Sequence, residues 1–503
     1  HPGSTAARGR RAARAATGHE AATEAGDMGL VTPMDPVPLE DLGRVHFTGI
    51  GGAGMSGIAR IMLSRGVPVS GSDAARSDLL SELAALGAEV HVGHAAAHLG
   101  AADTLVVSSA IRPDNPELAA ALERGLRVLH RAAALASVML GRRSVAVAGT
   151  HGKTTTTSML TTVLRECGAD PSYVIGGILA ETGRGADVGS GELFVAEADE
   201  SDGSFLMLSP DAAVVTCVEA DHLDNYPGLA EIEAAFGEFA ARIAPDGLLV
   251  ACADDPGARA LAGAARALPL RVRTYGESAG ADYRLTGVTP RGMTVSFDVS
   301  GPAGAGGAVT RVRLRVPGRH NALNATAVLA TCAELGFPAE QAARGLAAYR
   351  GARRRLELKG EADGVRVLDS YAHHPTELAA DLTAARDIAE GGRVIAVFQP
   401  HLFSRTRIFA TEFGAALGLA DEVLVLDVYP AREDPEPGVT GELVSRAVPG
   451  GQARFVPDTA AVPAAVAATA KPGDLVLTMG AGDVTALGQP VHDALRARGG
   501  PAG

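Results

Sequence analysis

The stretch "VAVAGTHGKTTTTSML" at residues 145–160 decides the fold of the central part of the chain. A short apolar run, typical of a buried strand, leads into a glycine-rich loop and then into a helix-forming segment. The loop carries the shortened phosphate-binding pattern Gly149-x-x-Gly152-Lys153-Thr154, because Val147 stands where a full Walker A pattern begins with glycine. We expect backbone N–H groups to line phosphate oxygens, the Lys153 ammonium to reach the terminal phosphates and the Thr154 hydroxyl to bind Mg²⁺. A chance match is the alternative, but Lys153 is one of only three lysines in the chain.

Short apolar segments alternate with Ala- and Leu-rich amphipathic segments in the rest of the sequence, which predicts an α/β fold with mostly parallel sheets. Residues 44–63 and 474–487 also place glycines after a predicted strand. The first of these contains G-x-G-x-x-G at Gly49, Gly51 and Gly54, and Asp73 ends the next predicted strand. Because open α/β sheets bind ligands at the carboxyl ends of their strands, each segment is a candidate site. The first loop indicates a dinucleotide or a UDP-type diphosphate, with a tight turn that binds no ligand as the alternative.

The composition limits the classes of partner and compartment. The net charge of −13 argues against nucleic acid and against an anionic membrane surface. Four widely spaced cysteines favour a reduced, cytoplasmic protein, and no apolar run approaches the length of about 18 residues that spans a membrane. Residues 1–40 lack the apolar centre of a signal peptide and are expected to form a disordered tail.

Acidic side chains follow two predicted strands near the phosphate loop. The side chains concerned are Glu197, Asp199, Glu200 and Asp202 after the first strand, and Glu219, Asp221, His222 and Asp224 after the second. Since the carboxyl ends of parallel strands share one edge, we expect ligands for Mg²⁺–ATP there, although single acids more often cap helices or solvate loops.

A separate stretch holds His91, His94 and His98 without a carboxylate or thiol, and we interpret them as ordinary core and surface histidines rather than a metal site.

Further segments add amides and basic groups. Asn321 and Asn324 are spaced to share one helical face and could bind an adenine edge, but helix capping is the commoner role of such a residue. Arg355, in "GARRRLELKG", could contact a phosphate or belong to a solvated turn, and Arg405 and Arg407 could bind a carboxylate or phosphate.

In this order the motifs resemble those of the Mur ligases, the ATP-dependent amide-forming enzymes of peptidoglycan precursor synthesis. The resemblance covers roughly residues 42–490. The segments that carry it are GIGGAGMSGIA (49–59), SSAI (108–111), GTHGKTTT (149–156), EADESDGSFL (197–206), EADHLDNY (219–226), GRHNALNA (318–325), DSYAHHPTE (369–377) and QPHLFSRTR (399–407). The first loop together with EADESDGSFL narrows the resemblance to members that attach L-alanine, or a whole peptide, to UDP-N-acetylmuramate.

The resemblance implies three α/β domains. They are an N-terminal Rossmann-like domain that binds the UDP substrate (41–140), a central P-loop-type ATP-binding domain with a mostly parallel sheet (141–350), and a C-terminal Rossmann-like domain that binds the amino acid (351–503).

The resemblance also implies roles for individual residues. The implied catalytic residues are Lys153, Glu197, His222 and Arg355. The implied Mg²⁺ ligands are Thr154, Glu197 and His222. ATP binding falls on Gly149, Thr150, His151, Gly152, Lys153, Thr154, Thr155, Asn321, Asn324 and Asp369. Binding of the UDP substrate falls on Gly49, Gly51, Gly52, Gly54, Met55, Ser56, Asp73, Ser108 and Ser109. The residues implied to bind the amino-acid and substrate carboxylates are His374, His401 and Arg405.

The implied reaction uses ATP and two Mg²⁺ ions to phosphorylate the lactyl carboxylate of UDP-N-acetylmuramate, after which the amine of L-alanine displaces phosphate. A monomer or weak homodimer is expected. The chain departs from the family pattern at Ser370 and Ala133, and it has no lysine between Lys153 and Lys359, which excludes a carbamylated lysine as a metal bridge there. Three alternatives stay open: a peptide-recycling muramate ligase, an NAD-dependent oxidoreductase, and a non-catalytic UDP-sugar-binding regulator.

Overall fold

The computed structural model describes residues 31–223, 225–302, 309–431 and 433–499. Most of the tail expected at residues 1–40 therefore lies outside the described residues. The chain divides into two compact units, of which the first extends to Val138 and also includes Asp202–Met207, and the second contains the remainder. Among the described residues, every helix is too short or too polar to cross a lipid bilayer.

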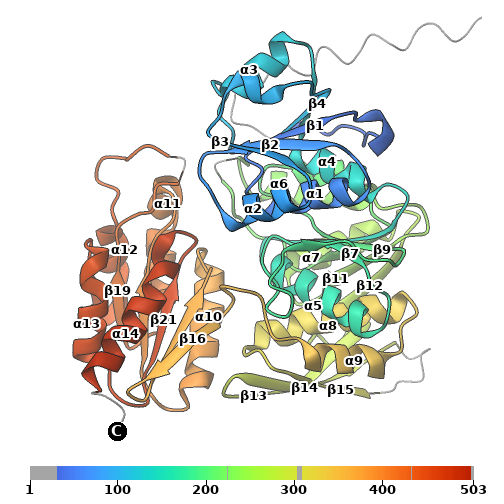
Figure 1. Ribbon diagram of the computed structural model, residues 1–503. Helices are drawn as coiled ribbons and strands as arrows, with labels where there is room; N and C mark the ends of the chain where they lie inside the picture. Colours follow the sequence, from blue (N-terminus) through green and yellow to red (C-terminus); the bar gives the residue numbers. More distant parts are fainter. Residues whose placement is uncertain (1–30, 224, 303–308, 432, 500–503) are drawn as a thin grey trace, which may run out of the picture. The chain divides into compact units, whose positions relative to one another are not determined.

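The first unit contains a five-stranded sheet in the order β3-β2-β1-β4-β5, in which all neighbouring strands are parallel (Figure 1). Its strands are β1 (Val45–Thr48), β2 (Val69–Asp73), β3 (Glu89–Val92), β4 (Thr104–Val107) and β5 (Arg127–His130). Its helices are α1 (Ala53–Ser64), α2 (Asp78–Ala85), α3 (Pro116–Glu123) and α4 (Arg131–Met139). Helix α3 begins where its residue types predict, with the Asn115 side chain as the cap and Pro116 in the first turn.

The second unit begins with a ten-stranded sheet in the order β15-β14-β13-β12-β11-β10-β6-β9-β7-β8. It is parallel from β13 to β7 and antiparallel at both edges. Its strands are β6 (Arg143–Ala148), β7 (Ser172–Val174), β8 (Ala186–Asp187), β9 (Leu193–Glu197), β10 (Ala212–Val215), β11 (Leu248–Cys252), β12 (Arg271–Gly276), β13 (Tyr283–Arg291), β14 (Thr294–Ser300) and β15 (Val309–Leu314).

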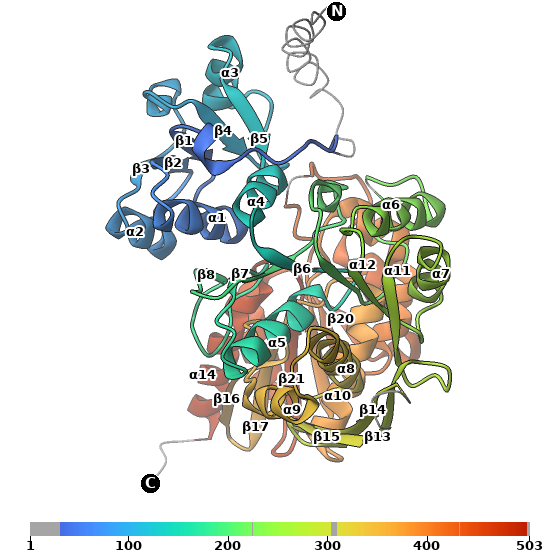
Figure 2. The same cartoon turned by 90° about the vertical axis from the view of Figure 1, so that its right-hand side faces the viewer.

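Five helices accompany the ten-stranded sheet. Helices α5 (Lys153–Glu166), α8 (Arg319–Glu334) and α9 (Ala339–Ala348) pack against one another, and α6 (Leu229–Ala241) and α7 (Pro256–Ala265) form a second pair (Figure 2). Strand β6 lies between β10 and β9 and is buried from Ser144 to Ala148. The phosphate loop therefore leaves the sheet from a fully buried central strand, which gives it a rigid base.

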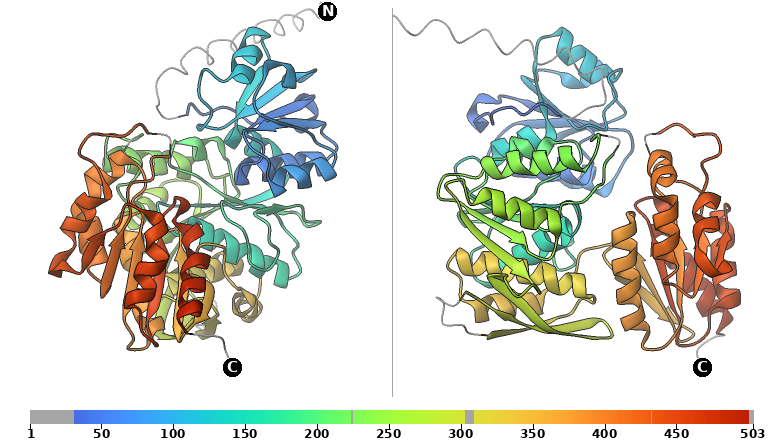
Figure 3. Two further views of the ribbon diagram at one scale, coloured as in Figure 1. Left: turned by 60° about the vertical axis from the view of Figure 1, so that its left-hand side comes forward. Right: turned by 180° about the vertical axis from the view of Figure 1, so that it is seen from behind.

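The second unit also contains a six-stranded sheet in the order β16-β17-β21-β18-β19-β20, parallel except for β16. Its strands are β16 (Glu357–Ala362), β17 (Val365–Ser370), β18 (Val394–Phe398), β19 (Glu422–Val425), β20 (Ala453–Phe455) and β21 (Leu475–Met479). Helices α10 (Pro375–Ala389), α11 (Phe403–Leu417) and α12 (Gly441–Ala447) cover one face, and α13 (Val462–Thr469) and α14 (Gly488–Arg498) cover the other (Figure 3). The predicted α/β architecture of three domains with mostly parallel sheets is confirmed, and the domain boundaries at residues 140 and 350 stay predictions.

Candidate active site

Three adjacent parallel strands of the ten-stranded sheet end at the same edge. Strand β9 ends at Glu197, β6 leads into the phosphate loop, and the segment after β10 carries Glu219, Asp221 and His222. The sheet topology thus brings together the loop and both acidic groups that the sequence predicts to accompany it.

The phosphate loop depends on its two glycines. Gly149 and Gly152 have φ values of 130° and 80°, in the region that favours glycine. A Cβ atom at Gly149 would lie 2.0 Å from Thr216 Oγ1, and one at Gly152 would lie 2.8 Å from Asn324 Oδ1. Helix α5 begins immediately afterwards at Lys153, so the free N–H groups of its first turn lie beside the loop, as anion binding requires. Thr155, in the same turn, is buried.

The Lys153 ammonium has three hydrogen-bond acceptors, two carbonyl oxygens of the loop and the carboxylate of Glu200. Its Nζ donates to the carbonyl oxygens of Gly149 at 2.7 Å and Thr150 at 3.1 Å, and to Glu200 Oε1 at 2.8 Å. Burial alone would lower the pKa of Lys153, but the negative charges of Glu200 and Asp199 outweigh that effect and raise it. The lysine is therefore a permanent cation at the loop. A phosphate that approaches it must compete with at least one of these acceptors.

Two oxygen donors suited to a hard cation lie beside the lysine. Thr154 Oγ1 donates to Glu197 Oε1 at 3.1 Å, while Glu197 Oε2 accepts from the backbone N–H of Gly176 at 2.8 Å. The Arg355 guanidinium lies 3.3 Å from Thr154 Oγ1. The hydroxyl and carboxylate predicted to bind Mg²⁺ are thus adjacent, and their oxygen chemistry fits that ion.

A chain of charged side chains leads from Lys153 to Arg405. His222 Nε2 lies 3.6 Å from both Glu200 Oε1 and Asp221 Oδ2. Asp221 Oδ1 in turn accepts from the Arg405 guanidinium at 3.1 Å. Asp221 and Arg405 are both buried. The charge of Asp221 therefore holds the arginine, on helix α11, at the edge of the sheet that carries the phosphate loop.

The predicted carboxylate-binding histidines lie on the six-stranded-sheet side of this site. His374 caps helix α10 and its ring centroid is 4.7 Å from that of His151, whereas His401 stacks against Tyr429 at 5.7 Å. Burial lowers the pKa of His374 to about 4, which leaves its imidazole neutral at physiological pH. A small cavity lies next to Arg405, and its lining residues are Asp221, His222, Leu223, Leu402, Ser404, Arg405, Ile408 and Phe409.

The predicted nucleoside-binding residues are not all brought together. Asn324 lies against Gly152, and Asn321 lies one helical turn away, where its amide donates to the Pro317 carbonyl oxygen at 2.6 Å. Asp369 is fully buried, and its carboxylate accepts from the hydroxyls of Thr478 at 2.8 Å and Thr485 at 2.6 Å. Among the described residues Asp369 has no hydrogen bond or ion pair to the phosphate loop, so its ribose role stays a prediction.

In the first unit, the glycine loop after β1 carries the residues predicted to bind the UDP substrate. The backbone N–H of Gly51 donates to Asp73 Oδ2 at 2.8 Å. Gly49 has a φ of 80°, Gly52 caps α1, Gly54 lies against Arg131, and Met55 and Ser56 are buried in the first turn of α1. Ser108 and Ser109 follow β4, and Ser109 Oγ donates to Asp202 Oδ2 at 2.5 Å, within the same unit. The loop and both serines stay predicted binding residues.

Glu377 was not among the residues singled out from the sequence, and nothing in its local sequence indicates it. Its Oε1 lies 3.4 Å from His151 Nδ1. Glu200, which the sequence does single out as a candidate ligand near the phosphate loop, contacts both Lys153 and His222.

Glu117 is a second acid that was not singled out from the sequence, and it lies beside two of the N-terminal histidines. It is fully buried and accepts hydrogen bonds from the hydroxyls of Thr48 at 2.8 Å and Ser72 at 2.6 Å. Its oxygens also lie 3.1 Å from His98 Nδ1 and 3.6 Å from His94 Nδ1. Burial would raise the pKa of Glu117, but its donors hold it well below the usual range. His94 and His98 thus have a carboxylate partner that their own stretch of sequence lacks, and the interpretation of the three histidines as ordinary core and surface side chains stays a prediction.

The chain matches three domain families in succession. "Mur ligase family, catalytic domain" matches residues 44–143, "Mur ligase middle domain" matches residues 147–332, and "Mur ligase, glutamate ligase domain" matches residues 354–482.

Similar proteins and structures extend over most of the chain. A UDP-N-acetylmuramate–L-alanine ligase of Thermobifida fusca is 58% identical over 476 residues, which cover 93% of this chain and 100% of the relative. Another, from Kineococcus radiotolerans, is 60% identical over 464 residues, which cover 91% of this chain and 97% of the relative. The crystal structure of the UDP-N-acetylmuramate–alanine ligase from Thermotoga maritima has a TM-score of 0.76 at 28% identity and covers 90% of this chain and 99% of that one. The crystal structure of a murein peptide ligase from Psychrobacter arcticus has a TM-score of 0.66 at 25% identity, and it covers 90% of this chain and 98% of that one. With family matches along its length and relatives of this identity, the chain belongs to the Mur ligase family.

Proposed function

We propose that this chain is an ATP-dependent ligase that joins L-alanine to the lactyl carboxylate of UDP-N-acetylmuramate, in peptidoglycan precursor synthesis. Relatives named as UDP-N-acetylmuramate–L-alanine ligases are 58–60% identical to it and are covered almost completely. Membership of a ligase family also leaves the oxidoreductase alternative without support. The observation that carries the proposal is the common sheet edge at which a phosphate loop, a Thr154–Glu197 oxygen pair and the Asp221–Arg405 pair meet.

The chemistry requires activation because an amine cannot displace oxide from a carboxylate. In the proposed reaction the lactyl carboxylate attacks the terminal phosphorus of ATP, ADP leaves, and the product is an acyl phosphate. The positive charges of Lys153 and Arg355 stabilise the oxygens that gain charge in this step. One Mg²⁺ held by Thr154 and Glu197, and a second held by His222, would neutralise phosphate charge in the bound nucleotide.

The second half of the reaction uses the other end of the site. Arg405 is proposed to bind the L-alanine carboxylate, and its hydrogen bond to Asp221 fixes the orientation of the guanidinium group. The free amine of alanine then attacks the acyl carbonyl carbon, the C–O bond to phosphate breaks, and inorganic phosphate leaves. Exclusion of water from this site protects the acyl phosphate from hydrolysis.

One assay separates the proposed activity from the peptide-recycling alternative. Release of phosphate is measured with ATP, Mg²⁺ and UDP-N-acetylmuramate, in parallel with L-alanine and with a tripeptide that has a free N-terminal amine. We expect L-alanine to support much faster release than the tripeptide. Faster release with the tripeptide would identify a recycling ligase, and no release with either would refute the proposed function.

Glycine and L-serine are the informative competitors of L-alanine in this assay. One methylene in an apolar pocket is worth about 1–3 kcal/mol, so we expect both to react with a lower kcat/KM than L-alanine.

A further inference from the structure

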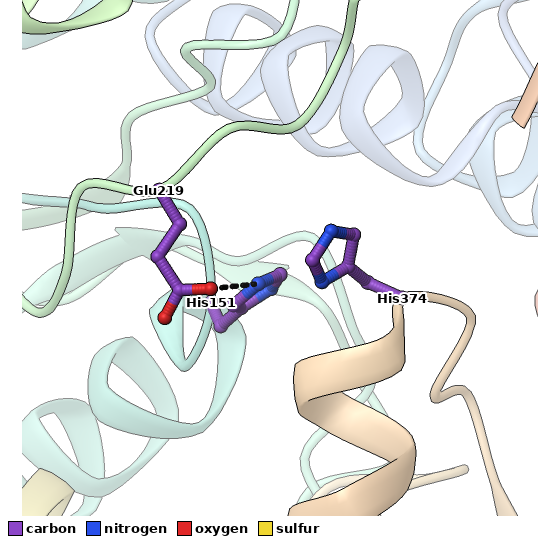
Figure 4. A group of neighbouring side chains, drawn as sticks. All are labelled: His151, Glu219 and His374. Carbon is purple, nitrogen blue, oxygen red and sulfur yellow. Dashed lines mark ion pairs between the residues drawn. The ribbon is translucent and has the colours of Figure 1, made fainter. Parts of the chain in front are cut away.

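Three side chains from different segments converge next to the phosphate loop. His151 comes from the loop after β6, Glu219 from the segment after β10, and His374 from the N-terminus of α10 (Figure 4). Each offers one ligand atom, and these atoms all lie within 4.8 Å of one another. Among the described residues, this is the one group of histidine, cysteine and carboxylate side chains with such spacing.

The side chains around these three residues are arranged like those around the ligands of known metal sites. Glu377 Oε1 lies 3.4 Å from His151 Nδ1, and the Thr376 hydroxyl donates to Glu219 Oε2 at 2.8 Å. Metal-binding histidines usually donate their second ring nitrogen to a carboxylate in this way, and metal-binding carboxylates usually accept a further hydrogen bond. The Nε2 atom of His151 is buried without a hydrogen-bond partner in the described part of the chain and lies 3.7 Å from Glu219 Oε2.

From this geometry we propose that His151, Glu219 and His374 form a binding site for a divalent transition-metal ion of the Zn²⁺, Co²⁺ and Ni²⁺ class. Two imidazoles and one carboxylate are a donor set for these ions, whereas Mg²⁺ takes mostly oxygen ligands and only occasionally an imidazole. The site is distinct from the Thr154–Glu197 oxygen pair, and it does not depend on the proposed ligase reaction.

The ion would connect the phosphate loop to helix α10. Bond lengths of about 2.0–2.2 Å in a tetrahedral site separate the ligand atoms by roughly 3.3 Å. The His151–Glu219 distance of 3.7 Å is already close to this value, so binding mainly draws the third ligand inward.

The test is a titration of the full chain with Co²⁺ in saturating Mg²⁺, followed by visible absorption and by calorimetry. We expect one ion per chain. His151→Gln and His374→Gln should abolish this binding, and Glu377→Gln should weaken it about 10- to 100-fold. His91→Gln, a matched control in the first unit, and His222→Gln, at the predicted Mg²⁺ site, should retain it.

Two results would overturn the proposal. One is the absence of Co²⁺ binding to the Mg²⁺-saturated protein. The other is binding that survives in both His151→Gln and His374→Gln, or that disappears in His222→Gln instead. Circular dichroism of each variant shows that the fold is retained, and Glu219→Gln provides a third test of the site if one histidine variant fails to fold.

Discussion

Replacement of Lys153 by methionine separates two roles of its ammonium group. The structure pairs this group with Glu200, and the two side chains are 14% and 2% exposed. Removal of one partner from a buried pair costs about 3–5 kcal/mol, because the remaining charge is left without compensation. Loss of one charged group that stabilises a transition state lowers turnover by about 10²- to 10³-fold. Lys153→Met should therefore lower both the free energy of unfolding and kcat.

The double variant Lys153→Met/Glu200→Gln distinguishes these effects. It removes the uncompensated carboxylate, so we expect the free energy of unfolding to recover by most of the loss while kcat stays at the level of the single variant. Phosphate release gives kcat, and denaturant unfolding followed by circular dichroism gives the stability. Recovery of activity in the double variant, or a single variant with more than about a tenth of wild-type turnover, would refute the reasoning.

Three further predictions concern other parts of the chain. Arg405→Lys should raise the KM for L-alanine about 10- to 100-fold, since it loses a charged hydrogen bond worth about 1.5–3 kcal/mol, and an unchanged KM in the phosphate-release assay would contradict its proposed role. Burial raises the pKa of Asp381 from 3.8 to about 7, so the folded chain holds this proton where the unfolded chain has lost it. Relative to Asp381→Asn, the wild type should lose stability as the pH rises from about 3.8 to about 7, and parallel curves of Tm against pH would exclude this effect. Glu117→Ala leaves buried Thr48 and Ser72 hydroxyls without their acceptor and should destabilise the first unit by about 3–5 kcal/mol, measured by thermal unfolding, with an unchanged Tm as the contradicting result.

Much of the fold could be predicted because its signals are local. The start of α5 at Lys153 follows from the glycine before it and the strand before that, and α10 starts at Pro375 as its residue type predicts. The order of the strands is a different matter, because it is set by contacts between distant segments. Strand β6, for example, lies between β10 and β9, and no local pattern identifies these neighbours.

The site could be predicted only in part, for the same reason. Glu197 and Thr154 were found because each follows a strand in a recognisable motif, and the structure places their side chains 3.1 Å apart. Glu117 and Glu377 could not be found, because their partners are remote in sequence. Glu117 meets His98 and Ser72 across the first unit, and Glu377 meets His151 across the second, so their importance appears only once the chain is folded.

The formation of an acyl phosphate is the central chemical claim, and transfer of isotope tests it most directly. UDP-N-acetylmuramate is prepared with a heavy oxygen isotope in its lactyl carboxylate and is converted with ATP and L-alanine, and the released phosphate is examined by mass spectrometry. If the carboxylate attacks phosphorus, each turnover places one labelled oxygen from the sugar acid in the phosphate. Phosphate that carries no label while the amide product forms would contradict the account.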